Sequence, residues 1–301
     1  MLSVAGLTRR FGDHLALDDV SFDVVPGRMT GFVGANGAGK TTTMRIILGV
    51  LASSSGWVAW NGRPLTQAVR HDFGYMPEER GLYPKMKIRD QLVFFGRLHG
   101  LDSLKAAERT DKLLGRLGLT ERAGDVLETL SLGNQQRVQI AAALVHEPIA
   151  LVLDEPFSGL DPLAVDAMVD LLREEVTSEV PVLFSSHQLE LVERLCDDLV
   201  VLSRGRVVAA GPVVELGAGP TTTYRLVIDG DAGWLRDVPR IKVRDVAGGT
   251  ALFDVETTAA DEGLVQQIVQ NVLQDAMSRG AVLEFGPERV ALSDVFREAT
   301  R

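Results

Sequence analysis

Runs of apolar residues alternate with polar, glycine-containing turns along the first two thirds of the chain. The apolar run "MTGFVG" predicts a buried strand, "GANGAGKTT" predicts a glycine-rich turn, and residues 41–48 predict the helix that follows. Later runs, "IALVLDEP", "PVLFSSH" and "DLVVLSRGRVVAAG", predict further strands separated by segments with helical spacing. Because strands that alternate with helices favour a mainly parallel sheet covered on both faces, the predicted class of this part is α/β.

A small helical insertion interrupts this pattern at about residues 86–135. The segments "RDQLVFFGRLHG" and "SLKAAERTDKLLGRLGL" place apolar residues at helical spacing. We therefore expect one large domain over residues 1–217 that carries a helical subdomain.

The pattern changes after residues 217–223, "GAGPTTT", which are typical of a linker. The segments "YRLVI", "AGWLRD", "IKVRDV", "ALFDV", "EGLVQQIVQNVLQDAMSRG" and "AVLEF" then predict the order β-α-β-β-α-β. This order indicates a small α+β, ferredoxin-like domain over residues 223–301. It contains no cofactor motif, so we expect an accessory or regulatory role.

Composition narrows the classes of partner. The formal charge is −10, with 31 Lys and Arg against 41 Asp and Glu, which is the wrong sign for a protein that holds a nucleic acid backbone. The single cysteine, Cys196, excludes an intramolecular disulfide and fits a reducing compartment. The N-terminus lacks a signal peptide pattern, and no apolar stretch reaches the roughly 18–20 residues of a membrane span. We expect a cytoplasmic chain whose membrane role, if it has one, depends on a partner.

The turn after the first buried strand matches the phosphate-binding pattern G-x-x-x-x-G-K-[ST]. Its strand-to-helix context argues against the alternative, a chance glycine-rich turn. Backbone N–H groups of such a loop surround phosphates, Lys40 neutralises the β- and γ-phosphates, and the Thr41 hydroxyl can ligate Mg²⁺. The predicted nucleotide-binding residues here are Gly34, Asn36, Gly37, Ala38, Gly39, Lys40, Thr41 and Thr42.

Two later strands end in residues suited to phosphate chemistry. Asp154 and Glu155 follow "IALVL", at the sheet edge where open α/β sheets bind ligands. Asp154 is predicted to hold Mg²⁺ and Glu155 to act as the general base on the attacking water. His187 follows the next strand and is predicted to contact the γ-phosphate. The alternatives are an acidic cap at a solvated turn and a structural histidine.

A second helix start suits an anion. In "LSLGNQQR", Ser131 is a good N-cap, and Ser131, Gly133 and the first free N–H groups present a positive dipole end. The loop at residues 34–42 already holds one nucleotide. The simplest interpretation is that this second helix start completes the nucleotide site of another copy of the chain.

Taken together, "GANGAGKTT", "LSLGNQQR", "LVLDEP", "SGLD" and the following His187 resemble the ATP-binding subunit of an ABC transporter from residue 2 to about residue 216. The resemblance implies a P-loop NTPase fold, ATP hydrolysis with Mg²⁺, and a head-to-tail homodimer with two ATP molecules between the copies. It also implies that Phe11 stacks on adenine, that Asn134 belongs to the signature at the partner's ATP, and that Asp161 lies in a loop crossing the interface. Phe11 alone could equally be a core residue.

Three positions depart from the family pattern. Leu132 replaces the usual glycine of the signature, Asn134 replaces glutamine, and Glu78 stands where the metal-binding glutamine of the family falls. The Glu78 carboxylate can still ligate Mg²⁺; the alternative is a solvated loop. In the same segment, Leu82, Tyr83 and Met86 are predicted to form an exposed apolar patch for a docking helix of a membrane partner; the alternative is that they pack the helical insertion against the sheet.

The segments "EERGLY" and "GNQQ", the short insertion and the small last domain resemble a branch of bacterial exporters that includes sodium- and antibiotic-efflux ATPases. In that branch the membrane-spanning permease is a separate chain, which implies a subunit peripheral to the inner face of the cell membrane. The alternatives are a soluble ABC ATPase acting on nucleic acid or the ribosome, and a nucleotide-binding regulator without turnover. No residue pattern names the transported substrate.

Overall fold

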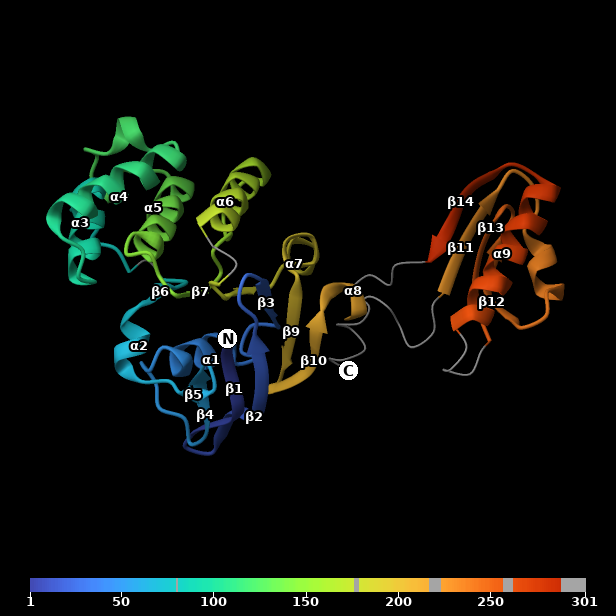
Figure 1. Ribbon diagram of the computed structural model, residues 1–301, viewed down its shortest axis with the longest axis horizontal. Helices are drawn as coiled ribbons and strands as arrows, with labels where there is room; N and C mark the ends of the chain where they lie inside the picture. Colours follow the sequence, from blue (N-terminus) through green and yellow to red (C-terminus); the bar gives the residue numbers. More distant parts are fainter. Residues whose placement is uncertain (80, 176–178, 217–222, 257–261, 288–301) are drawn as a thin grey trace. The chain divides into compact units, whose positions relative to one another are not determined.

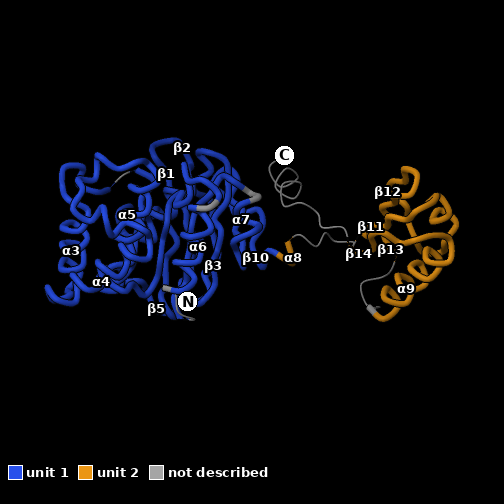
Figure 2. The backbone as a smooth tube through the Cα atoms, turned by 90° about the horizontal axis from the view of Figure 1, so that it is seen from above, with its two compact units in different colours: residues 1–213, 296–301 blue, residues 214–295 orange. Residues whose placement is uncertain are grey.

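The computed structural model describes residues 1–79, 81–175, 179–216, 223–256 and 262–287 (Figure 1). They fall in two compact units, one built on Met1–Val213 and one within Val214–Val295 (Figure 2). Most of the predicted linker, residues 217–222, lies outside the described residues, as do Arg80 and residues 288–301.

A six-stranded sheet forms the centre of the first unit, in the order β10-β9-β3-β8-β7-β6. β6, β7, β8, β3 and β9 run parallel, and β10 closes an antiparallel hairpin with β9. Every residue of β3, β7 and β8 is buried, as their continuous apolar runs predict. The bounds are β3 Met29–Val33, β6 Phe73–Met76, β7 Ala150–Leu153, β8 Val182–Ser186, β9 Asp198–Ser203 and β10 Arg206–Pro212.

A separate antiparallel sheet has the order β2-β1-β4-β5 and packs, together with helix α1, against the central sheet. Its apolar side chains share one core with α1 and the parallel strands; Leu7, Met44 and Phe32 represent the three layers. The apolar pattern of the sequence does not predict this second sheet. The bounds are β1 Leu2–Phe11, β2 His14–Val24, α1 Lys40–Ile47, β4 Ser55–Trp60 and β5 Arg63–Pro64.

Three packed helices form the helical insertion (Figure 1). They are α3 Ile88–Leu98, α4 Ser103–Arg116 and α5 Leu132–Leu144, so the last helix runs beyond the predicted limit at residue 135 and leads to β7. Arg89 on α3 makes a bidentate pair with Asp111 on α4, at 2.7 and 2.8 Å. The remaining helices are α2 Gln67–His71, α6 Pro162–Glu175, α7 Leu189–Leu195 and α8 Val213–Leu216, with short 3₁₀ turns at Thr120–Arg122 and Leu127–Thr129.

The second unit is a four-stranded antiparallel sheet covered by one long helix. The strand order β12-β13-β11-β14 is that of a ferredoxin-like domain. The predicted first helix, "AGWLRD", is instead a 3₁₀ turn at Gly233–Asp237, because Pro239 follows at once and ends it. The other bounds are β11 Thr223–Ile228, β12 Ile241–Ala247, β13 Thr250–Val255, α9 Glu262–Arg279 and β14 Val282–Pro287.

Candidate functional site

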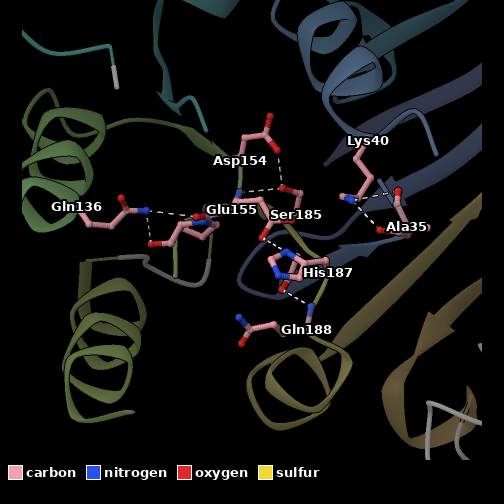
Figure 3. Close-up of polar contacts among 11 residues, drawn as sticks. Ala35, Lys40, Gln136, Asp154, Glu155, Ser185, His187 and Gln188 are labelled. Atoms are coloured by element: carbon pink, nitrogen blue, oxygen red, sulfur yellow. Dashed lines mark hydrogen bonds and ion pairs between the residues drawn. The ribbon is translucent and has the colours of Figure 1, made fainter. Parts of the chain in front are cut away.

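The phosphate-binding loop lies between β3 and α1, and two of its glycines are required by close approaches. A Cβ on Gly34 would lie 2.4 Å from the carbonyl oxygen of Leu202, and Gly39 has φ +110° with Leu17 against it. Lys40, 7% exposed, begins α1 and directs its ammonium back into the loop, where Nζ donates to the Gly34 carbonyl at 2.6 Å (Figure 3). The positive charge is therefore fixed inside the turn of backbone N–H groups.

A pocket of about 370 Å³ opens over this loop. It brings together the loop, the end of β1, Glu78 and the two carboxylates that follow β7. Phe11 is 46% exposed and lines the pocket, so the structure places it outside the core. The described lining residues are Phe11, His14, Ala16, Ala35, Asn36, Gly37, Gly39, Lys40, Thr41, Thr42, Glu78, Asp154 and Glu155.

Ser185 on β8 holds both carboxylate residues. Its hydroxyl donates to Asp154 Oδ1 at 2.6 Å and accepts from the backbone N–H of Glu155 at 2.8 Å (Figure 3). Asp154 is buried, and its Oδ2 has no hydrogen-bond partner in the part of the chain that the structure describes. A buried carboxylate oxygen is costly unless it is paired.

These residues fit a Mg²⁺ ion. The unpaired Asp154 oxygen, the Thr41 hydroxyl and the Glu78 carboxylate line one pocket, and all are oxygen donors of the kind that Mg²⁺ prefers. Among the described residues, no group of three or more His, Cys, Asp or Glu side chains could hold a metal by itself. That agrees with the usual Mg²⁺ site at a nucleotide, where one or two carboxylates act together with phosphate oxygens.

Glu155 has a backbone conformation that few non-glycine residues adopt, with φ +51°. Besides the Ser185 contact to its N–H, its carbonyl accepts from Gln136 Nε2 at 3.2 Å, and the same amide donates to Pro156 at 2.9 Å. Contacts on both sides of the peptide therefore keep the residue in this conformation. Such strain persists only where neighbours impose it, and it is common at functional sites.

His187 follows β8 and contacts Glu155. Because a carboxylate can only accept, the Nδ1–H of His187 donates to Glu155 Oε2, at 3.0 Å (Figure 3). The Glu155 side chain is only 11% exposed, whereas half of the histidine is exposed. The two residues predicted separately from the sequence thus form one pair, with His187 beside the pocket and not in its described lining.

The residues of the second helix start lie elsewhere on the chain. Ser131 caps α5 by accepting from the N–H of Asn134 at 3.4 Å, and Asp161 caps α6 by accepting from Ala164 at 2.8 Å. A Cβ on Gly133 would lie 3.4 Å from Leu160, so the two segments are in contact. Ser131, Gly133, Asn134 and Asp161 are absent from the described lining of the pocket.

The segment after Glu78 differs in part from its prediction as an exposed apolar patch. Tyr83 is 52% exposed and Met86 half-buried, but Leu82 is 9% exposed and faces a second pocket of about 380 Å³. Phe95 of α3 and Gln139 of α5 line this pocket too, which explains why a residue that looked exposed in the sequence is covered. The prediction for Leu82 is therefore wrong.

Sequence reasoning gives no role to three residues of the site. Ser185 orients both carboxylates, Gln136 holds the Glu155 turn, and His14 lines the pocket opposite Phe11 in the β1–β2 register. Ser185 lies two residues before His187 in "FSSH", and Gln136 lies within the signature segment "LSLGNQQR". Position within or next to a motif is the signal that could have found Ser185 and Gln136.

Comparison with known proteins decides the family. The sequence pattern described as "ABC transporter" matches residues 17–158. The "Uncharacterized ABC transporter ATP-binding protein YhaQ" of Bacillus subtilis (strain 168) is 39% identical over 303 residues, which cover 99% of this chain and 98% of that one. The chain belongs to the ATP-binding proteins of ABC transporters. It is therefore a nucleotide-binding ATPase of the ABC type.

Two further relatives of this ABC ATPase bear on its function and fold. The "Linearmycin resistance ATP-binding protein LnrL" of Bacillus subtilis (strain 168) is 33% identical over 76% of each chain. A solved structure, "Structure of ATP binding subunit of ABC transporter", is 34% identical with a TM-score of 0.67 and covers 72% of this chain and 91% of that one. The predicted P-loop fold of the ABC type is thus confirmed. No helix within the described ranges has the length and apolar character needed to cross a membrane.

Proposed function

We propose that this ABC ATPase powers export of sodium ion or of a drug-like compound, antibiotics included, through a separate membrane-spanning permease. The subunit is then cytoplasmic and peripheral on the inner face of the cell membrane. The observation that carries the proposal is the presence, on one chain, of a nucleotide pocket and of a second phosphate-type helix start outside that pocket. The linearmycin resistance relative favours drug efflux.

The pocket supports in-line attack of water on the γ-phosphate. Lys40 and the loop N–H groups bind the phosphates. Thr41, Asp154 and Glu78 would hold Mg²⁺, which when bound would stabilise charge on the transferring phosphoryl group. Glu155 accepts the proton of the attacking water, and His187 orients the Glu155 carboxylate. Glu78→Gln retains an oxygen donor, so we expect hydrolysis to survive this change.

The second half of each site comes from another copy of the chain. Ser131, which is exposed, caps α5, and half-buried Gly133 and Asn134 lie in its first turn, a helix start suited to the γ-phosphate of a partner's ATP. Asp161 lies in the adjoining loop, next to Leu160, which Gly133 approaches. ATP therefore joins two copies in a homodimer. With Glu155→Gln, which slows hydrolysis, saturating Mg²⁺-ATP should give a dimer by light scattering; a monomer with ATP demonstrably bound contradicts the arrangement.

The permease docks on the helical insertion and on the segment that precedes it. Tyr83 of that segment and Phe94 and Leu98 of α3 are exposed apolar side chains, and Tyr83 contacts the ring of Phe94 with centroids 6.2 Å apart. Leu98 also lines the pocket that contains Leu82. We call Tyr83, Phe94 and Leu98 the docking patch. An exposed aromatic patch beside a pocket is typical of an interface that receives a helix.

Reconstitution tests this function. The full chain is combined in vesicles with a permease of about six spanning segments. This complex should hydrolyse ATP faster than the isolated subunit and should move substrate only when ATP is present. Tyr83→Asp should abolish transport while the ATPase activity of the isolated subunit persists. Val50→Asp changes an exposed apolar residue outside the docking patch, one that is more exposed than Tyr83, and should transport normally. Normal transport by Tyr83→Asp refutes docking at this patch.

A further inference from the structure

One contact at the nucleobase end of the pocket is not explained by the motifs. The guanidinium of Arg9 lies over the ring of Phe11, with Cζ 4.6 Å from the ring centroid. The two residues are two positions apart on β1, where an irregularity of the β1–β2 register between Arg9 and Arg10 interrupts the regular alternation of side chains. Phe11 lines the nucleotide pocket, whereas Arg9 is not among its described lining residues. Arg9 therefore contacts the ring from outside the described lining of the pocket.

Arg9 is itself held in place. Its Nη1 donates to the carbonyl of Ala52 at 3.0 Å, in the loop between α1 and β4. The side chain is half-buried, and its Nε is buried without a hydrogen-bond partner in the described structure. The guanidinium is thus fixed between a backbone carbonyl and an aromatic ring.

An exposed phenylalanine at a strand end needs such a support. Phe11 precedes the two-residue turn of Gly12 and Asp13 and is about half exposed. Few packing contacts therefore favour one rotamer of its side chain over the others. A ring that is already fixed loses less conformational freedom when a base stacks on it. A guanidinium over one ring face also adds a cation–π attraction that favours a single orientation.

We propose that Arg9 is a positioning residue for nucleotide binding, which covers one face of the Phe11 ring and leaves the other face for the nucleobase. The proposal rests on the assignment of Phe11 to the nucleobase in the proposed function. It requires nothing of the permease or of the dimer.

The chain offers a matched control. Arg10 is the adjacent residue, is exposed, and has no side-chain hydrogen bond or ion pair to any described residue. Arg9→Met and Arg10→Met remove the same charge, so a general loss of attraction for an anion affects both. Calorimetry on the full chain with Mg²⁺-ADP should give a Kd about threefold to tenfold higher for Arg9→Met and a change below about twofold for Arg10→Met.

Two further readouts separate positioning from a structural effect. Competition by inorganic pyrophosphate, which lacks the base, should be the same in both variants. In a Phe11→Leu background, Arg9→Met should no longer change the affinity for ADP. Three results would overturn the proposal. Arg9→Met and Arg10→Met could raise the Kd for ADP equally, or Arg9→Met could weaken pyrophosphate binding as much as ADP binding. Arg9→Met could also weaken ADP binding fully in the Phe11→Leu background.

Arg9→Lys keeps the charge and the stem and serves if Arg9→Met does not fold. It should weaken ADP binding by an intermediate factor, and only when Phe11 is present. If Phe11→Leu leaves the affinity for ADP unchanged, the assignment of Phe11 in the proposed function fails. If Phe11→Leu weakens binding but neither Arg9 variant does, only this inference fails.

Discussion

A pair of stacked histidines should make the first unit sensitive to mild acid. The rings of His99 and His146 lie 3.8 Å apart and nearly parallel, where the end of α3 meets the segment after α5. His146 donates through Nε2–H to the carbonyl of Phe73, and its Nδ1 is buried without a partner among the described residues. A proton on Nδ1 would therefore bring a charge next to another imidazole without an acceptor.

The size of the effect follows from proton linkage. Burial, with the neighbouring His99 second, lowers the pKa of His146 from 6.5 to about 4. Between these values the unfolded chain binds a proton that the folded chain does not, so stability is complete above pH 6.5 and falls as the pH falls. Each tenfold difference in proton affinity is worth about 1.4 kcal/mol. The lowered pKa of His146 should therefore reduce the free energy of unfolding at pH 5 by roughly 2 kcal/mol relative to its value above pH 6.5.

Urea unfolding followed by tryptophan fluorescence measures this cost. Trp234→Phe leaves Trp57 and Trp60 of the first unit as the reporters, since the chain has three tryptophans. Between pH 7.5 and pH 5, this parent should lose about 2 kcal/mol more than its His146→Gln derivative. His14→Gln, which removes an exposed histidine, should match the parent. Equal losses in the parent and in His146→Gln would refute the reasoning.

Three further outcomes are expected at the nucleotide site and the second unit. Lys40→Ala should lower kcat by about 100-fold or more in a phosphate-release assay, because no other described lysine or arginine lines the pocket; unchanged turnover would place the activity elsewhere. Ser185→Ala should reduce kcat and destabilise the chain by about 1–3 kcal/mol by calorimetry, because it leaves a buried Asp154 oxygen unpaired; wild-type values for both would contradict the contact. A chain ending at Gly219 should bind ADP normally and differ in dimer lifetime; a folded truncation that binds no nucleotide would refute a regulatory second unit.

Much of the site was predictable because its chemistry lies in short contiguous motifs. The phosphate loop, the Asp154–Glu155 pair and His187 each follow a buried strand, and parallel strands bring their carboxyl ends to one sheet edge. The contact between Glu155 and His187 then follows from the adjacency of β7 and β8, which the sequence alone does not state.

What remained unpredicted depends on distant partners. Leu82 is buried by residues of α3 and α5, and Arg9 is fixed by the carbonyl of Ala52, 43 positions away. The separate antiparallel sheet forms because β1 pairs with β4, although β2, β3 and α1 lie between them in the sequence. Local periodicity carries no information about these pairings, since it records only which face of a segment is apolar.

The central claim is that the start of α5 in one copy, which carries the signature residues, completes the nucleotide site of the other copy. Mixing two defective variants, Lys40→Ala and Ser131→Arg, tests it most directly. Each variant alone should hydrolyse almost no ATP, because both of its sites carry the defect. In a mixed dimer one site carries both defects, and the other pairs an intact Lys40 with an intact Ser131. The account predicts that ATPase activity appears on mixing at concentrations that favour the dimer; a mixture as inactive as its components, with mixed dimers demonstrably present, would contradict it.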